Sequence, residues 1–282
     1  METMTVTCWG TRGSIPVSGP QFVRHGGATT CVEVTCGAQR FIIDCGSGLA
    51  ELGRTRGFAL KDAIILQTHM HWDHVQGFPF FTPLFNKDAR FELWAVDRGD
   101  KPLEQILREQ MTAPTFPISL DMIPAALDFV RVAQAGDVEV GGARVRWVEG
   151  HHPGGVTAWR IDFNGASVMF TGDAEVQLGG REALLELARG VDVLIMDAQY
   201  MPHEYEARRG WGHSTPLDAV SLAREANVAH LLLTHHDPAH DDLRLADKLT
   251  LAREAAGGHL VVDNAYDRLC LQPGGYVHRG AA

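Results

Sequence analysis

Short apolar runs recur along the chain, and each of them ends abruptly in aspartate or histidine. The runs FIID, AIILQTH, VMFTGD, VDVLIMD and HLLLTH end at Asp44, His69, Asp173, Asp197 and His235. Runs this short and this apolar are typical of buried strands that are covered on both faces. We therefore expect polar side chains from distant parts of the chain to meet at one edge of a sheet, where α/β folds place their sites.

The segments between these runs have the periodicity of helices. DKPLEQILREQM begins with Asp100 as a cap, and STPLDAVSLAREAN offers Ser214 or Thr215 as a cap. DDLRLADKLTLAREAAGG has acidic residues first, apolar residues at helical spacing and Gly257 at its end. These patterns predict three helices between and after the strands.

The stretch FVRVAQAGDVEVGGARVRWVEG, residues 129–150, alternates apolar and polar residues around glycine-rich turns. This alternation predicts antiparallel hairpin strands. Two broad halves each run from strands to helices, and no low-complexity linker separates them. We therefore expect a single α/β domain over residues 1–282.

The composition of the chain limits which binding partners and which cellular compartment we expect. The chain has 282 residues, 45% of them hydrophobic, and its 35 acidic and 25 basic residues give a formal charge of −10. An acidic surface repels long polyanions, so we expect a small anionic substrate and no long nucleic acid. Five cysteines, the lack of a signal sequence and the lack of a membrane-length apolar run predict a cytoplasmic protein with no membrane partner. The oligomeric state is left open, with a homodimer among the states considered.

The stretch LQTHMHWDHVQG holds four coordinating side chains within six residues: His69, His71, Asp73 and His74. Residues two apart in an extended segment point to the same side, so His69 and His71 can bind one metal ion. Asp73 and His74 follow where the chain turns, and they can face a second ion.

Four ligands do not complete two metal sites, so the hypothesis requires more histidine and aspartate at other strand ends. EGHHPGG supplies His151 or His152, FTGD supplies Asp173, and LLTHHDP supplies His235 or His236. Imidazole and carboxylate together favour two Zn²⁺ ions, with Mn²⁺ or Fe²⁺ as alternatives.

The order HMHWDH, HHPGG, TGD and LTH resembles the metallo-β-lactamase superfamily over most of the chain. The resemblance implies a four-layer αββα sandwich of two mixed β-sheets flanked by helices, with a dinuclear site at the sheet edge. It implies that one ion is held by His69, His71 and His152. It implies that the other is held by Asp73, His74 and His235, and that Asp173 bridges the two.

Two further features bear on the branch of this superfamily. The β-lactamases themselves generally have cysteine where this chain has Asp173, which disfavours antibiotic hydrolysis. The triplet His213-Ser214-Thr215 before a helix resembles the phosphodiesterase branch, which includes tRNA 3′-processing endonucleases and cyclic-nucleotide phosphodiesterases. In that branch this histidine lies over the metals and assists the leaving group.

These features predict a dinuclear phosphodiesterase that acts on a small nucleotide diester such as a cyclic nucleotide. A hydroxide between the metals would be the nucleophile and His213 the general acid, with Asp73 as the other catalytic residue. The alternatives are a thioester or lactone hydrolase, an RNA-processing endonuclease, and a non-enzymatic nucleotide-binding module. The expected substrate contacts are Arg12, Ser14, Ser214 and Thr215. Asp44 and Asp197 are expected to orient ligand imidazoles.

Overall fold

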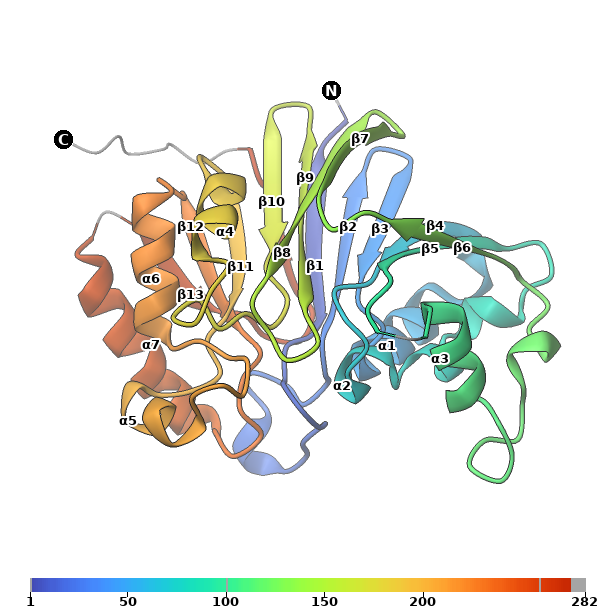
Figure 1. The fold of residues 1–282 in the computed structure, drawn as a ribbon, viewed down its shortest axis with the longest axis horizontal. Coiled ribbons are helices and arrows are strands. Elements are labelled where there is room, and N and C mark those ends of the chain that lie inside the picture. The colour runs from blue at the N-terminus through green and yellow to red at the C-terminus, as the bar shows by residue number, and fades with distance from the viewer. Residues whose placement is uncertain (1, 100, 259, 275–282) are drawn as a thin grey trace.

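Two seven-stranded sheets lie against each other in the structure, a computed structural model that describes residues 2–99, 101–258 and 260–274 (Figure 1). In spatial order, the first sheet consists of β14 (Leu269–Leu271), β1 (Met4–Gly10), β2 (Cys31–Cys36), β3 (Gln39–Ile43), β4 (Asp62–Leu66), β5 (Arg90–Val96) and β6 (Ala126–Val132). The second consists of β13 (Val261–Asn264), β12 (His230–Thr234), β11 (Val193–Asp197), β10 (Ala166–Phe170), β9 (Val156–Phe163), β8 (Ala143–Gly150) and β7 (Gly136–Val140).

Helices cover the outer face of each sheet. The α-helices are α1 (Ser47–Arg56), α2 (Trp72–Val75), α3 (Leu103–Gln110), α4 (Arg181–Ala188), α5 (Pro202–Tyr205), α6 (Pro216–Glu225) and α7 (Asp242–Ala256). The short 3-10 helices are η1 (Pro20–Phe22), η2 (Gly57–Ala59), η3 (Phe78–Phe80), η4 (Thr82–Phe85), η5 (Leu120–Met122) and η6 (Glu206–Arg208).

The inner faces of both sheets form one apolar core, to which Phe41 of β3 and Ile161 of β9 belong. A second core lies between the other face of β9–β12 and helices α4, α6 and α7, and a third includes α1 and α3 (Figure 1). The four layers confirm the predicted αββα sandwich.

Each sheet contains a parallel part that carries polar residues at its carboxyl ends. Strands β3 to β6 are parallel in the first sheet, and β10 to β13 are parallel in the second. The five apolar runs of the sequence form β3, β4, β10, β11 and β12. Because carboxyl ends of parallel strands share one edge, this topology brings the residues after these strands together.

The helices lie close to their predicted positions. Thr215 caps α6, where its hydroxyl accepts from the Asp218 N–H and the Asp218 carboxylate accepts from the Thr215 N–H. Gly257, with φ of +65°, ends α7 in the left-handed conformation that favours glycine. Asp100, the expected cap of α3, lies outside the described residues.

The hairpin prediction for residues 129–150 was wrong at its start. Strands β7 and β8 do form an antiparallel hairpin, but Phe129 to Val132 belong to β6, which pairs parallel with β5 in the other sheet. As the edge strand of its sheet, β6 is partly exposed along its length. A half-exposed parallel edge strand therefore shows the alternation that is usual for hairpins.

Among the described residues, no helix is long and apolar enough to cross a membrane.

Candidate metal centre

The first four candidate ligands follow β4. After Leu66 the chain stays extended to His71, whose φ and ψ are −64° and 155°, and the short helix α2 then carries Asp73 and His74. The Gln67 side chain fixes this turn, because its amide donates to the carbonyls of His69 and His74. A side chain that precedes the six-residue motif therefore holds its backbone in place.

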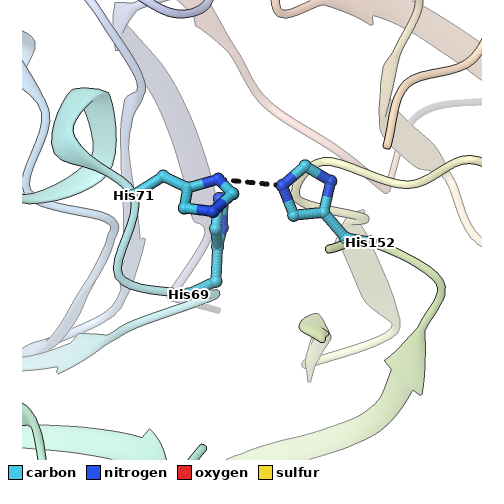
Figure 2. A group of neighbouring side chains, drawn as sticks. All are labelled: His69, His71 and His152. Atoms are coloured by element: carbon cyan, nitrogen blue, oxygen red, sulfur yellow. Dashed lines mark hydrogen bonds between the residues drawn. The ribbon is translucent and has the colours of Figure 1, made fainter. Parts of the chain in front are cut away.

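The structure brings His69, His71 and His152 together (Figure 2). His71 Nδ1 and His152 Nε2 lie 2.9 Å apart, and the ring centroids of His69 and His152 lie 4.7 Å apart. Of the two adjacent histidines in this segment, His151 is exposed and His152 is buried. Two of these histidines come from the first sheet's edge and the third from the end of β8.

A second cluster joins Asp73, His74, Asp173 and His235, all of them buried. The Asp173 Oδ2 atom lies 3.2 Å from His74 Nε2, 3.1 Å from His235 Nε2 and 3.6 Å from His69 Nε2. Asp173 therefore faces both clusters, which is the position expected of a bridging ligand. His236 points away, and its Nε2 contacts the Ala265 carbonyl at 2.9 Å.

The remaining ring nitrogens of the histidines are held by outer partners. His74 Nδ1 donates to Asp44 at 2.7 Å, His235 Nδ1 to the Gln199 side-chain oxygen at 2.8 Å, and His152 Nδ1 to the Gly212 carbonyl at 2.8 Å. Each contact fixes the tautomer and leaves Nε2 free toward the cluster.

Three residues at the centre have strained backbone conformations. Ser14, Asp44 and His235 have φ angles of +62°, +63° and +55°, a region that residues other than glycine seldom adopt. Such strain persists where surrounding contacts over-determine the geometry, and it clusters at functional sites. Here it aims Asp44 at His74 and aligns His235 with Asp73 and Asp173.

Burial and charge set the protonation of this centre. Burial lowers the pKa of His69 well below its ordinary value. Burial would raise the pKa of Asp173, but the nearby His235 and His74 outweigh it and hold that pKa well below its usual range. Burial would lower the pKa of His74, but Asp173, Asp73 and Asp44 outweigh it and hold that pKa well above its ordinary value, so metal binding must displace a proton from this imidazole.

The described residues fit two divalent ions. His69 Nε2 and Asp173 Oδ1 are buried and without a hydrogen-bond partner among those residues, which is costly unless something else binds them. The donor atoms of each cluster lie within 4.8 Å of one another, and all are imidazole nitrogens or carboxylate oxygens. This donor set suits Zn²⁺ and related divalent ions.

His213 lies next to the second cluster. Its ring stacks on that of His235 with centroids 4.9 Å apart, and its Nδ1 lies 3.0 Å from Asp197 and 4.0 Å from Asp173. Burial would lower the pKa of His213, but Asp197 and Asp173 outweigh it and raise the pKa to about 9. Because Nδ1 faces Asp197, Nε2 is the nitrogen of this ring that can face a substrate. Asp197, expected beside a metal ligand, orients His213 instead.

The expected substrate contacts have other partners. Arg12 is fully buried, and its guanidinium donates to the carbonyls of Gly26, Asp237 and His240, so this side chain supports the loop after β12. The Ser214 hydroxyl donates to the Ala174 carbonyl, and Thr215 caps α6. Ser14 is exposed, and its backbone N–H donates to Asp73 at 2.7 Å.

Two residues that orient the site were not predicted from the sequence. Gln199 holds His235, and its position two residues after a predicted strand end was the one signal in the sequence for it. Glu175 is fully buried and accepts from the Tyr205 hydroxyl and from the N–H groups of Gly210 and Gly212, all at 2.8 Å. It thereby fixes the segment that leads to His213.

The fold and the donor set define a metal-dependent hydrolase. Residues 39–236 match the family described as the beta-lactamase superfamily domain, and the chain belongs to this superfamily. The family fold implies divalent metal ions at the two clusters. The predicted superfamily membership is confirmed.

Relatives in sequence carry the name ribonuclease Z. The protein from Brevibacillus brevis is 41% identical over 78 residues, which cover 28% of this chain and 23% of that protein. The protein from Haloarcula marismortui is 24% identical, and the match covers 92% of this chain and 94% of that protein. The resemblance to the branch that contains tRNA 3′-processing enzymes is confirmed.

These relatives overturn the expectation that a long nucleic acid is excluded, because their name is that of enzymes acting on RNA. The net charge of −10 describes the whole surface. A site that binds divalent cations can be locally positive within an acidic protein, so the net charge does not exclude RNA.

Solved structures share the fold. The metallo-beta-lactamase fold protein YhfI from Bacillus subtilis aligns with a TM-score of 0.74 and 20% identity over 96% of this chain and all of that one (100%). Human tRNase Z, short form, aligns with a TM-score of 0.66 and 18% identity over 95% of this chain and 98% of that one. At these identities the likeness extends to the fold alone.

Proposed function

We propose that the protein is a dinuclear phosphodiesterase that cleaves RNA endonucleolytically. The observation that carries the proposal is His213, an imidazole that stacks on the candidate ligand His235 and is oriented by Asp197. The ribonuclease Z relatives favour RNA as the substrate over the cyclic nucleotide predicted from the sequence.

Each residue of the centre has a distinct role in the proposed reaction. His69, His71 and His152 would hold one ion, Asp73, His74 and His235 the other, and Asp173 both. When bound, two divalent ions supply a hydroxide at neutral pH and offset the charge that builds on the phosphate oxygens. His213 Nε2 gives its proton to the departing O3′ as the P–O3′ bond breaks, and Asp197 stabilises the charged imidazolium until then. The products are a 3′-hydroxyl and a 5′-phosphate.

The test separates the proton donor from the metal site. The zinc-loaded wild type is expected to cleave an RNA hairpin with a 3′ extension, read on a denaturing gel. His213→Ala should lower kcat on this RNA by about 10²–10⁴-fold and retain its zinc, because one general acid is removed. The same variant should lose little on bis(p-nitrophenyl) phosphate, whose leaving group departs without a proton.

Competing substrates belong in the same panel. Faster turnover of a cyclic mononucleotide, a thioester or a lactone than of any RNA would reject RNA as the substrate. Tight nucleotide binding with no product over long incubation would instead support a binding module. An equal loss by His213→Ala on both phosphodiesters would reject its role as proton donor.

A further inference from the structure

The six tryptophans of the chain divide sharply by exposure. Trp9, Trp94, Trp147 and Trp159 are between 0% and 8% exposed, and they belong to the cores. Trp72 and Trp211 are 59% and 62% exposed. Exposing an indole forgoes a large gain from burial, so two such residues in one protein point to a binding role.

Both exposed tryptophans are sequence neighbours of residues at the metal centre. Trp72 directly follows His71, and Trp211 directly precedes Gly212. His71 Nδ1 lies 2.9 Å from His152 Nε2, and His152 Nδ1 lies 2.8 Å from the Gly212 carbonyl. A short chain of contacts thus crosses the centre, with one exposed tryptophan at each end.

The backbone on both sides of each indole is fixed. The N–H groups of Gly210 and Gly212, which flank Trp211, both donate to the buried Glu175 carboxylate at 2.8 Å. Trp72 lies between two candidate ligands, and its carbonyl accepts from Gln76 at 2.9 Å. Anchored in this way, the backbone that carries each ring needs little reordering when a ligand binds.

Positive charge lies beside Trp211. Arg208 and Arg209 precede Trp211 in the sequence. The backbone N–H of Trp211 donates to the Arg208 carbonyl at 3.0 Å. Arg208 packs over the Tyr200 ring at 5.1 Å, while Arg209 is exposed and 3.7 Å from Glu206. In a protein of charge −10, this is the chemistry that a backbone phosphate requires next to a stacked base.

We propose that Trp72 and Trp211 stack on the two bases that flank the cleaved phosphate of a single RNA strand, and that Arg208 and Arg209 bind an adjoining phosphate. The proposal rests on the proposed function and names its substrate class as an unpaired RNA segment. Every base has a π-face, so this recognition tolerates changes of sequence.

The experiment measures binding separately from cleavage. A short fluorescein-labelled oligoribonucleotide with 3′-methylene phosphonate linkages, which have no O3′ to release, and the same backbone with abasic residues are titrated with the zinc-loaded protein, and the anisotropy gives Kd. The wild type should bind the base-bearing strand about tenfold or more tightly than the abasic strand, as stacking on aromatic rings predicts. Trp211→Leu, which keeps apolar bulk, should lose most of this ratio, and Trp211→Phe should keep most of it.

The matched control is Phe58→Leu. Phe58 is 56% exposed and lies on η2, before the amino end of β4 and thus away from the centre. This variant should keep the wild-type ratio, and Trp72→Leu should lower it as Trp211→Leu does.

The outcomes separate the two proposals. Equal affinities for both strands in the wild type, or an unchanged ratio in Trp211→Leu, would overturn the stacking proposal. Base-dependent binding that Trp211→Leu removes, without RNA cleavage by the wild type, would support stacking and reject the proposed function. RNA cleavage by the wild type, together with equal affinities for both strands, would support the proposed function and reject stacking.

Discussion

Gly13 lies so close to His235 that no side chain fits between them. A Cβ atom at Gly13 would lie 2.4 Å from both Cε1 and Nδ1 of the His235 ring. The closest contact of real Cβ atoms is well above this distance, so Gly13→Ala must displace the imidazole or the loop. The glycine is therefore part of the geometry of the site although it binds nothing.

Gly13→Ala should weaken zinc binding by about 10–100-fold, because displacing His235 also breaks its contact with Gln199. Competition with a chromophoric chelator measures this change. Gly179→Ala is the control, since a Cβ there would meet the exposed His151 ring no closer than 3.3 Å. Wild-type zinc affinity in Gly13→Ala would contradict this prediction.

At the scale of residues, the sequence predicted side chains that are close together in the chain and those that follow strands. His69 to His74 form one local motif, and Asp173 and His235 follow apolar runs. Arg12 was expected to contact substrate, and the structure buries it fully. Its burial depends on carbonyls more than 200 positions away, as the separations of 225 and 228 residues show, and no local pattern encodes them.

Helix α7 supports the site through one buried lysine. Lys248 Nζ donates to the carbonyls of Ala198 and Gln199, which follow β11, at 2.7 and 2.9 Å. Gln199 in turn holds His235. Burial lowers the pKa of Lys248 to about 7, although Asp237 and Asp197 oppose that shift.

This lowered pKa makes stability depend on pH. Between about pH 7 and the ordinary value of 10.5, the unfolded chain binds the proton and the folded one releases it, so this lysine makes unfolding harder as pH rises. We compare wild type and Lys248→Met after a chelator has removed bound metal. In that pH window the unfolding free energy of the wild type should rise by up to about 1.4 kcal/mol per pH unit more than that of Lys248→Met. Urea titrations at several pH values measure it. Lys101→Met, at a side chain that is 50% exposed, should keep the wild-type slope, and equal slopes in all three proteins would contradict the prediction.

At the scale of elements, the sequence predicted the strands that are buried on both faces. Strands β10, β11 and β12 are buried at every residue, so their apolar runs leave no other interpretation. The edge strand β6 was misassigned because its partner is chosen by tertiary packing and not by its own alternation. Periodicity gives exposure along a strand, and it does not give the neighbouring strand.

At the scale of the whole molecule, the metal centre joins the two sheets. His69, His71, Asp73 and His74 follow β4 of the first sheet, whereas His152, Asp173 and His235 follow β8, β10 and β12 of the second. Ions bound between them stabilise the folded state and not the unfolded one.

Free zinc at about 100 times its Kd should raise the unfolding free energy by about 2.7 kcal/mol per site, and a chelator should remove this gain. Thermal denaturation with and without chelator measures the effect. Asp173→Asn should lose most of the zinc effect, because this residue faces both clusters. Asp162→Asn, which removes a carboxylate paired with Arg160 at 2.9 Å, should keep it. No zinc effect in the wild type would contradict the metal centre.

The spread of the ligands along the chain has a consequence for biosynthesis. Asp73 and its neighbour in space His235 are 162 positions apart. A nascent polypeptide leaving the ribosome therefore lacks His235, a candidate ligand of the second ion, until most of its 282 residues have been made. The full set of candidate ligands is present only after β12 has been translated and has joined its sheet, so we expect no hydrolytic activity from an incompletely made chain.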